Sequence, residues 1–446
     1  MIKLFLNLWL NWRRKQQFKS ALRKNQRQKA FKLLEEIINS GAKLSLTETL
    51  FHKQIKLEQL VDQHKRINHD LVTKINVLSA PVDQGLLPDA EAINYLRQEL
   101  KITAHDSCHL QITGIDQIVF DDLEKQIYDY LEEEFDKYKE NPAQLNRNLQ
   151  LALKDINNLK QGKDPAYNQK FTPHVYLMKY FLDNTYTIYL AWLLIYEFGL
   201  LPQKFTLLDL AAGPSTTAYG LDLLYRSLQR VINLRPLHLS YFSIEQRETL
   251  QYRGLQLWRR YMASQTTPNN TYFQFLTGDI FNLENWLDQI PKNFFDFIVI
   301  SHCFFSDPQK RHQSVKAYQE IFQNCLVDHG YVLLIIQDKK LFKTYNIEQT
   351  NNIEDERNAV KNLLNDLDLN LVWYRYLSST PNRELMERRQ FGTFANSNLP
   401  KQKYISDLLQ KYVEQKFTNH YTLDDYIILG TLNQSNRTSS TDLKQP

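Results

Sequence analysis

The stretch LLDLAAGPSTTAYGL, residues 207–221, is the part of the sequence that most clearly indicates its fold. An apolar strand ends at Asp209, a turn of small residues follows, and a helix is predicted to begin at Pro214. Proline suits a first helical position because it has no backbone N–H in need of a partner. Gly213 can adopt a positive φ, and small neighbours let a ligand approach the backbone closely. The stretch therefore predicts a ligand site beyond the carboxyl ends of parallel strands.

Short β-type runs alternate with amphipathic helical segments around this stretch. Such alternation predicts right-handed crossovers and a mainly parallel sheet. We expect an α/β fold with a doubly wound, seven-stranded Rossmann sheet whose last strand is antiparallel. The predicted strands are residues 206–211, 239–245, 272–277, 295–301, 331–337, 371–377 and 426–432.

A chain of 446 residues exceeds what one hydrophobic core usually serves, so we expect more than one domain. Apolar spacings of three and four over residues 16–80 and 121–140 are typical of helices. Residues 1–165 are predicted to form an all-α N-terminal domain, and residues 166–433 to form the α/β domain. The polar tail, residues 434–446, is predicted to be disordered.

Basic residues are concentrated at the amino terminus. The first 32 residues contain ten Lys or Arg and no acid, whereas the whole chain has a net charge of only +4. Trp9, Trp12, Phe18 and Phe31 lie among these cations. This arm, residues 1–32, is predicted to bind an anionic surface, either RNA or a membrane face. The alternative is a solvated helix that docks on the acidic segment 121–140.

Cysteine use and hydropathy predict a cytoplasmic protein. Cys108, Cys303 and Cys325 form no CxxC pair, which argues against a disulfide framework. The first residues do not follow the pattern of a secretory signal. The longest apolar stretch, residues 188–201, is interrupted by Glu197 and is too short for a transmembrane segment.

The ordered motifs of the second half resemble those of the class I S-adenosylmethionine-dependent methyltransferases. Asp209 matches the acid of the first motif, which the resemblance places towards the methionine end of the cofactor. Glu245, which closes SYFSIE, matches the acid that binds the ribose hydroxyls. Asp279 in LTGDIF matches the acid near the adenine amino group, with Ile280 as an apolar neighbour of the base. FFDFIVISHCFF and HGYVLLII resemble the fourth-strand and fifth-strand motifs.

The resemblance implies a methyltransferase-type sheet that binds S-adenosylmethionine near Ala211, Gly213 and Ser215. The family favours glycine at all three positions, and this chain keeps only Gly213. One alternative is that the fold survives while cofactor binding is lost. Acids at the ends of three separate strands favour retained binding, although each one could instead cap a helix.

The segment SHCFFSDPQKRH, residues 301–312, follows the predicted fourth strand, where the family keeps groups that face the methyl acceptor. Ser301 is expected beside the cofactor. His302 is the candidate general base because imidazole titrates near neutrality. The alternative is a histidine that only packs or hydrogen-bonds at a strand end. Cys303 is interpreted as a small buried apolar residue.

Two further groups of residues were considered as sites. HDSCH, residues 105–109, holds four possible metal ligands, but adjacent positions rarely surround one ion, so no metal site is predicted. Arg383, Arg388 and Arg389 either contact an anionic acceptor or solvate a helix. They precede a helix predicted over residues 401–417. The sequence contains no GxSxG, P-loop or HExxH motif.

These features predict an S-adenosylmethionine-dependent methyltransferase acting on an unidentified acceptor, which is RNA, protein or a small molecule. The alternative is a non-catalytic binding or assembly factor with a methyltransferase fold, associated with RNA or the ribosome. A helical lead-in before LLDLAAGP also distantly resembles the methyltransferase-like factors of ribosomal small-subunit assembly.

Overall fold

The computed structural model describes residues 2–23, 27–40, 42, 44, 86–161, 165–265, 269–348, 352–383 and 386–433. The chain divides into two compact units, Met1–Val82 and Asp83–Pro446. The predicted disordered tail, 434–446, and most of the helix predicted over the second half of 16–80 lie outside the described residues.

The described part of the first unit is a pair of helices, α1 (Ile2–Arg23) and α2 (Arg27–Asn39). Their contact buries a small apolar cluster made by Phe18, Ala21, Ala30, Leu34 and Ile37. Arg14 donates to Glu36 at 2.9 Å. Binding of RNA or a membrane by the arm stays a prediction.

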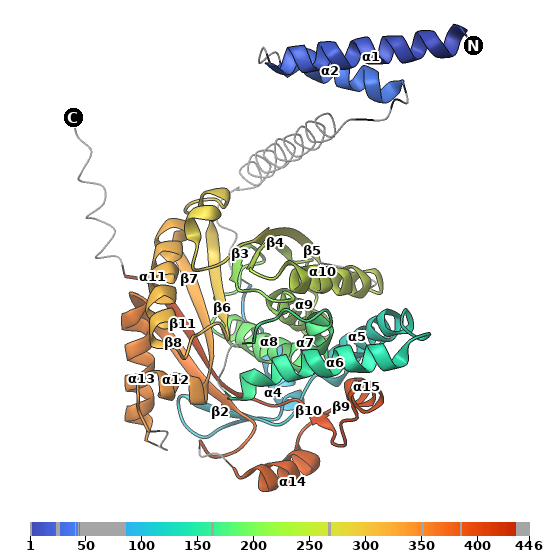
Figure 1. Ribbon diagram of the computed structural model, residues 1–446. Helices are drawn as coiled ribbons and strands as arrows, with labels where there is room; N and C mark the ends of the chain where they lie inside the picture. Colours follow the sequence, from blue (N-terminus) through green and yellow to red (C-terminus); the bar gives the residue numbers. More distant parts are fainter. Residues whose placement is uncertain are drawn as a thin grey trace, which may run out of the picture. The chain divides into compact units, whose positions relative to one another are not determined.

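The second unit is built on one sheet of nine strands in the order β1-β2-β8-β11-β7-β6-β3-β4-β5 (Figure 1). The strands are β1 (Ile102–Ala104), β2 (His109–Ile112), β3 (Lys204–Leu210), β4 (His238–Glu245), β5 (Asn270–Thr277), β6 (Phe295–Ser301), β7 (Leu326–Gln337), β8 (Leu369–Ser378) and β11 (Asp424–Leu432). A separate pair is β9 (Lys401–Gln402) with β10 (Asn419–His420).

The helices of this unit are α4 (Ala90–Glu99), α5 (Gln117–Asp136), α6 (Pro142–Ile156), α7 (Thr172–Lys179), α8 (Phe181–Glu197), α9 (Thr216–Gln229), α10 (Glu248–Ala263), α11 (Pro308–Cys325), α12 (Asp338–Thr344), α13 (Ile353–Asp366), α14 (Arg388–Asn398) and α15 (Lys403–Val413). Short 3-10 turns cover Asn157–Gln161, Leu283–Asn285 and Leu287–Gln289. Among the described residues, none of the helices combines the length and the apolar character needed to cross a bilayer.

The strand order is that of a doubly wound sheet. On one side of β3 lie β4 and then β5, and on its other side lie β6 and then β7. All five strands are parallel to one another. Each of the seven predicted runs forms a strand, and the last, β11, is antiparallel to both β7 and β8 as expected. The fold is therefore Rossmann-like, with its topological switch point between β3 and β6.

The sheet has nine strands where seven were predicted, and residues 1–165, which were predicted to be all-α, include the strands β1 and β2. β1 and β2 form a hairpin, and β2 adds to the sheet parallel to β8, where His109 pairs with Tyr376. The hairpin supplies hydrogen-bond partners to the backbone at one end of β8, which would otherwise be an edge strand. Strands of only three or four residues carry too little pattern to be recognised in the sequence. Residue 165 also does not separate compact units, because α5 and α6 share a core with the sheet.

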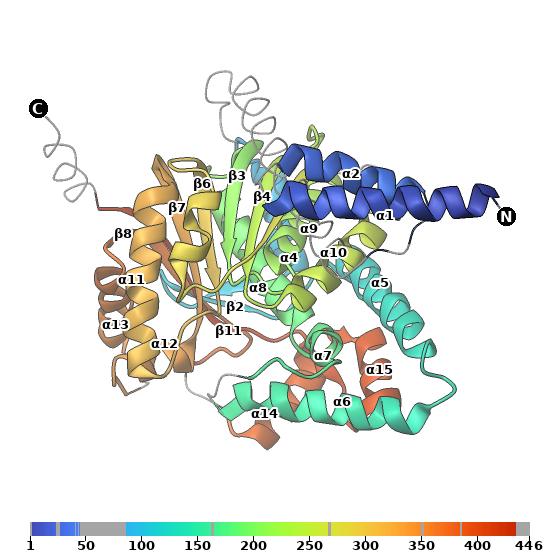
Figure 2. The ribbon, with the colours of Figure 1, turned by 45° about the horizontal axis from the view of Figure 1, so that its top comes forward.

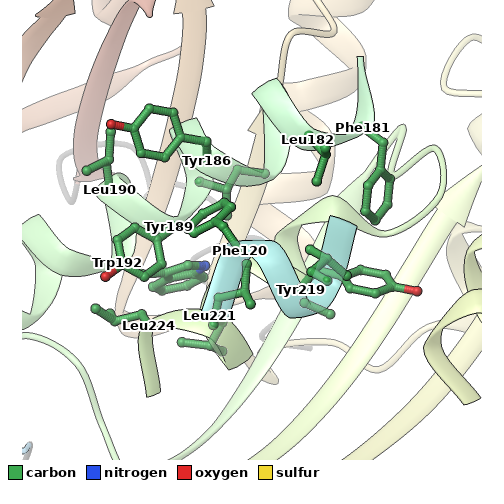
Figure 3. Packing of buried hydrophobic residues seen from close by; sticks show 14 of the residues in the cluster. Phe120, Phe181, Leu182, Tyr186, Tyr189, Leu190, Trp192, Tyr219, Leu221 and Leu224 are labelled. Carbon is green, nitrogen blue, oxygen red and sulfur yellow. The ribbon is translucent and has the colours of Figure 1, made fainter. Parts of the chain in front are cut away.

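The pleat of the strands divides the core into two layers. Leu207 and Val299 face one side, which is covered by α5 and α7–α10, whereas Leu208 and Ile300 face the other, covered by α11–α13. Figure 2 shows these helices on the two faces of the sheet. Figure 3 shows how aromatic and aliphatic side chains of α5, α8 and α9 fill the first layer. The aromatic-rich stretch before β3 thus forms two buried helices, α7 and α8.

The acidic face of α5 is engaged within the second unit. Glu133 accepts from Arg260 and Glu134 from Arg253 at 2.6 Å, both on α10, and Lys411 of α15 donates to Glu132. These contacts join α5 to two helices that follow much later in the chain. The acidic side chains of α5 therefore form ion pairs with other helices of the same unit.

Candidate functional site

The predicted site residues collect at the carboxyl edge of the sheet, on both sides of the switch point. The β3–β6 register pairs Leu210 with Ile300, so Ala211 and Ser301 leave the sheet side by side. Asp209 and Glu245 share the strand parity of residues that face the layer of α7–α10. The residues that end β3 and β6, the strands of the first and fourth motifs, therefore lie close together.

The turn after β3 is held in a left-handed backbone conformation at alternate residues. The φ values are 53° at Ala211, 54° at Gly213 and 67° at Ser215. The predicted helix start at Pro214 is wrong, because Ser215 is left-handed and helix α9 begins only at Thr216. A left-handed L-residue costs about 1–2 kcal/mol, which the surrounding structure must offset. Such conformations cluster at functional sites.

Glu245 binds the turn directly. Its Oε2 accepts from the Gly213 N–H at 2.9 Å, and its Oε1 accepts from the Arg247 N–H at 2.8 Å. The residue is 8% exposed, and burial raises its pKa while the backbone N–H groups oppose that shift. Each carboxylate oxygen can accept a second hydrogen bond, so the group retains capacity for a ligand hydroxyl.

Asp209 lies beneath the turn and is 1% exposed. The Tyr241 hydroxyl of β4 donates to its Oδ2. Burial raises the pKa of Asp209 to about 7, and the hydrogen bond from Tyr241 acts in the opposite direction. Asp209 therefore braces β3 against β4 from within the protein.

Asp279 follows β5 and lies next to the Glu245 turn. Its Oδ2 accepts from the Gln246 side chain at 2.9 Å, and its Oδ1 accepts from the Phe281 N–H at 3.0 Å. The Gly278 N–H donates to the Glu245 carbonyl at 3.1 Å, which joins the two loops. Ile280 is buried in the opposite core layer. The structure thus brings Asp279 to the edge and turns Ile280 into the core.

Tyr176 is a residue at this edge that the sequence argument missed. Among described residues beyond the chain neighbours, only its hydroxyl would lie within 4 Å of a Cβ built on Gly213, at 3.9 Å. Asn184 donates to the same hydroxyl at 2.9 Å. Burial, and then the charge of Glu245, raises the pKa of Tyr176. The aromatic-rich stretch before the first motif was the available signal, but it did not specify which aromatic faces the turn.

His302 is held between two hydrogen-bond partners. Its Nδ1 lies 2.9 Å from the Ser301 Oγ, and its Nε2 lies 3.0 Å from the Asp425 Oδ1. His302 is also left-handed, with φ of 60°, and its N–H donates to the Ile335 carbonyl at 2.9 Å. The candidate base therefore lies beside the turn of β3, and both of its ring nitrogens are engaged.

Asp425 is a second residue that the sequence argument missed. It lies at the start of β11, and Thr187 of α8 donates to its Oδ2 at 3.2 Å. A signal was present, because an antiparallel strand begins at the edge where its parallel neighbours end. The acids of TLDDYIILG were therefore placed by topology at the same edge as His302.

The other residues after β6 have structural contacts. Asp307 caps helix α11, where its Oδ1 accepts from the Lys310 N–H at 2.9 Å. The Tyr318 hydroxyl donates to the carbonyl of Cys303 at 2.7 Å. Cys303 itself packs at the margin of the second core layer. These two residues shape the loop that carries His302.

The HDSCH segment and Arg383 form one polar network near the β1–β2 hairpin. Asp106 accepts from the N–H groups of Cys108 and His109 and, at 2.9 Å, from Arg383. Arg383 also donates to Glu356 at 2.7 Å. Within the described ranges, no three His, Cys, Asp or Glu side chains are arranged to hold a metal ion.

This network revises the interpretation of Arg383. Its guanidinium is committed to two carboxylates, so it neither solvates a helix nor awaits an anionic acceptor. Burial opposes ionisation of Asp106, but the hydrogen bonds of Arg383 and the two N–H groups outweigh it and hold the pKa at about 2. Arg389 is exposed on α14.

No model of a known protein family matches the sequence, and no curated protein matches it. Among the solved structures with a similar fold are the following three. Fibrillarin in its Nop5p complex is 14% identical over 52% of this chain and 75% of its own, with a TM-score of 0.28. The Methanococcus jannaschii fibrillarin pre-rRNA processing protein is 12% identical over 52% and 67%, with a TM-score of 0.26.

The third is the arsenic(III) S-adenosylmethionine methyltransferase of Chlamydomonas reinhardtii. It is 11% identical over 51% of this chain and 64% of its own, with a TM-score of 0.28. At these values the similarities assign neither a family nor an activity to this chain. The strand order and the contacts at the carboxyl edge therefore carry the functional reasoning.

Proposed function

We propose that this protein binds S-adenosylmethionine at the carboxyl edge between β3 and β6 and transfers its methyl group to an acceptor. The observation that carries the proposal is the run of left-handed residues at the switch point, Ala211, Ser215 and His302, beside Gly213. Two loops that meet at a switch point both keep a costly backbone conformation there. Strain of this kind is retained where a site depends on the geometry.

The residues at the edge fit the proposed cofactor. The space over Gly213 is sparsely occupied, whereas a Cβ on the helical Gly254 would lie 2.3 Å from the Pro214 carbonyl oxygen. The turn therefore packs tightly against α10 behind it and presents its other face towards Tyr176. Glu245 has lone pairs for the ribose diol, and Asp279 lies one loop further along for a hydrogen bond to the adenine amino group.

S-Adenosylmethionine, when bound, supplies an electrophilic methyl group on a sulfonium. The protein then has to hold the acceptor in line and exclude water, because positioning and desolvation account for much of such a displacement. Ser301 and His302 leave the sheet beside Ala211 and are therefore the groups that face the acceptor. His302 is the candidate base for an acceptor that must lose a proton.

The test is calorimetric titration of the full chain with S-adenosylmethionine. We expect binding by the wild-type protein and its loss in Gly213→Val, which places a branched side chain on the open face of the turn at a left-handed φ. Gly392→Val is the matched control, because a Cβ at Gly392 meets no described atom within 4 Å. No heat at millimolar ligand would overturn the proposal in favour of a non-catalytic protein with this fold.

A further inference from the structure

A hydrogen-bonded chain crosses the carboxyl edge from β6 to β11. Ser301 contacts the Nδ1 of His302 at 2.9 Å, and the Nε2 of His302 contacts Asp425 at 3.0 Å. The His302 side chain is 20% exposed and that of Asp425 is 9% exposed. The imidazole is therefore reachable from outside, while its acidic partner is almost covered.

The two contacts define which nitrogen carries the proton in the neutral ring. A carboxylate only accepts hydrogen bonds, so Asp425 requires an N–H at Nε2. The lone pair then lies at Nδ1, which faces the hydroxyl of Ser301. A carboxylate that fixes a tautomer in this way also stabilises the imidazolium formed when the other nitrogen takes a proton.

Asp425 is itself held in place from the helical layer. Thr187 of α8 donates to the oxygen that does not contact His302, at 3.2 Å. Asp183, on the same helix, accepts from Gln402 at 2.7 Å. Burial, and then the charge of Asp425, raises the pKa of Asp183 to about 8. Asp424 is turned away and accepts from Tyr376 at 2.9 Å.

We propose that the acceptor is protic, that His302 takes its O–H or N–H proton, and that Asp425 is the positioning residue that directs the lone pair of Nδ1 outward. This inference rests on the proposed methyl transfer. The acceptor oxygen or nitrogen bonds to the methyl carbon as the carbon–sulfur bond breaks, and that electron pair stays on sulfur. The acceptor proton moves to Nδ1, directly or through the Ser301 hydroxyl, and the resulting imidazolium is paired with Asp425. An acceptor without a proton to lose, such as a thioether or a tertiary amine, does not need this arrangement.

The first experiment tests the positioning in ligand-free protein. Selective ¹⁵N labelling of histidine should show downfield, exchange-protected Nε2–H resonances for His109, whose Nε2 lies 2.7 Å from the Ser378 Oγ, and for His302. The His302 resonance is the one that is lost in His302→Gln. Asp425→Asn should shift it upfield or abolish it, and Ser301→Ala should retain it. Asp424→Asn is the matched control and should leave it unchanged. Absence of the resonance, or its survival unchanged in Asp425→Asn, overturns the proposal.

The second experiment separates a base from a histidine that only packs. Diethyl pyrocarbonate acylates neutral imidazole nitrogens, and peptide mass spectrometry gives the rate at each histidine. The exposed His312 sets the fast limit and the buried His174 the slow limit. His302 should react between these limits, and faster in Ser301→Ala, which removes the partner of Nδ1. A rate equal to that of His174 in both proteins overturns the proposal.

S-Adenosylhomocysteine links this inference to the proposed function without an acceptor. Bound at the turn of β3, it should slow acylation of His302 and leave that of His312 unchanged. If the calorimetric titration shows binding and acylation of His302 is not slowed, the proposed base is not beside the cofactor and the inference fails. If the titration shows no binding, the proposed function fails, while the ring resonance still reports the His302–Asp425 contact.

Discussion

Replacing Ala211 by glycine should make the protein more stable, which is the opposite of the usual effect of this substitution. Ala211 has a φ of 53°, where its Cβ crowds the backbone at a cost of about 1–2 kcal/mol. Glycine avoids that cost but loses about 0.5–1 kcal/mol through its freer unfolded chain. Ala211 is only half-buried, so little apolar burial is lost. The balance is a gain of about 0.5–1 kcal/mol in the free energy of unfolding.

Urea unfolding followed by tryptophan fluorescence measures the change, because Trp192 and Trp258 are buried in the second unit. Ser215→Gly, at a φ of 67°, should shift the midpoint in the same direction. Ala143→Gly is the matched control: this alanine is exposed in the first turn of α6, where glycine should lower stability by less than about 1 kcal/mol. If Ala211→Gly is destabilised like the control, the left-handed turn is not strained and the main support for the proposed site is lost.

Three further predictions concern packing and charge. Gly254→Ala should lower the free energy of unfolding by about 1–3 kcal/mol and weaken S-adenosylmethionine binding, because the added Cβ would lie 2.3 Å from the Pro214 carbonyl oxygen. Unchanged stability in urea unfolding would contradict that contact. Arg383→Met should lower the free energy of unfolding by about 3–5 kcal/mol, because it leaves the fully buried Glu356 without its ion-pair partner. Adding Glu356→Gln to that variant should restore part of the lost stability. A loss below about 1 kcal/mol in Arg383→Met would refute the buried pair. Burial raises the pKa of Asp183 from an ordinary 3.8 to about 8 in the folded state, so the folded protein holds this proton to a higher pH than the unfolded chain does. Stability should therefore fall as pH rises from about 4 to 8, by up to about 1.4 kcal/mol per pH unit. Asp183→Asn should reduce that slope, and an unchanged slope in urea titrations would contradict the assignment.

Elements whose signal is local could be predicted from the sequence. All seven β-type runs became strands because each is rich in aliphatic, β-branched or aromatic residues and is bounded by turn residues. The short strands β1 and β2 were missed because three or four residues carry too little pattern, and they form only where an edge of β8 is available. The start of α9 was misplaced for a related reason, since the proline rule does not show that Ser215 is left-handed.

Part of the candidate site could likewise be predicted from the sequence, and part could not. Asp209, Gly213 and Glu245 follow strands in order along the chain, so their shared edge was predictable from the alternation of strands and helices. Whether each side chain faces a ligand or the core was not predictable from the sequence. Ile280, in the second core layer, and Arg383, in a buried ion pair, are two residues whose packing only the structure shows. A strand period of two fixes the face of a residue only once the neighbouring layers are known.

The doubly wound sheet and the edge at which its motifs meet could thus be inferred from local patterns, because hydrophobic periodicity and turn residues act over a few positions. The contact between Asp425 and His302 could not, since these residues lie 123 positions apart and are brought together by an antiparallel strand inserted between two others. That contact is a product of the three-dimensional packing. The same packing decides that Tyr176 faces Gly213. Contacts of this kind depend on how whole layers pack, and no local pattern in the chain encodes them.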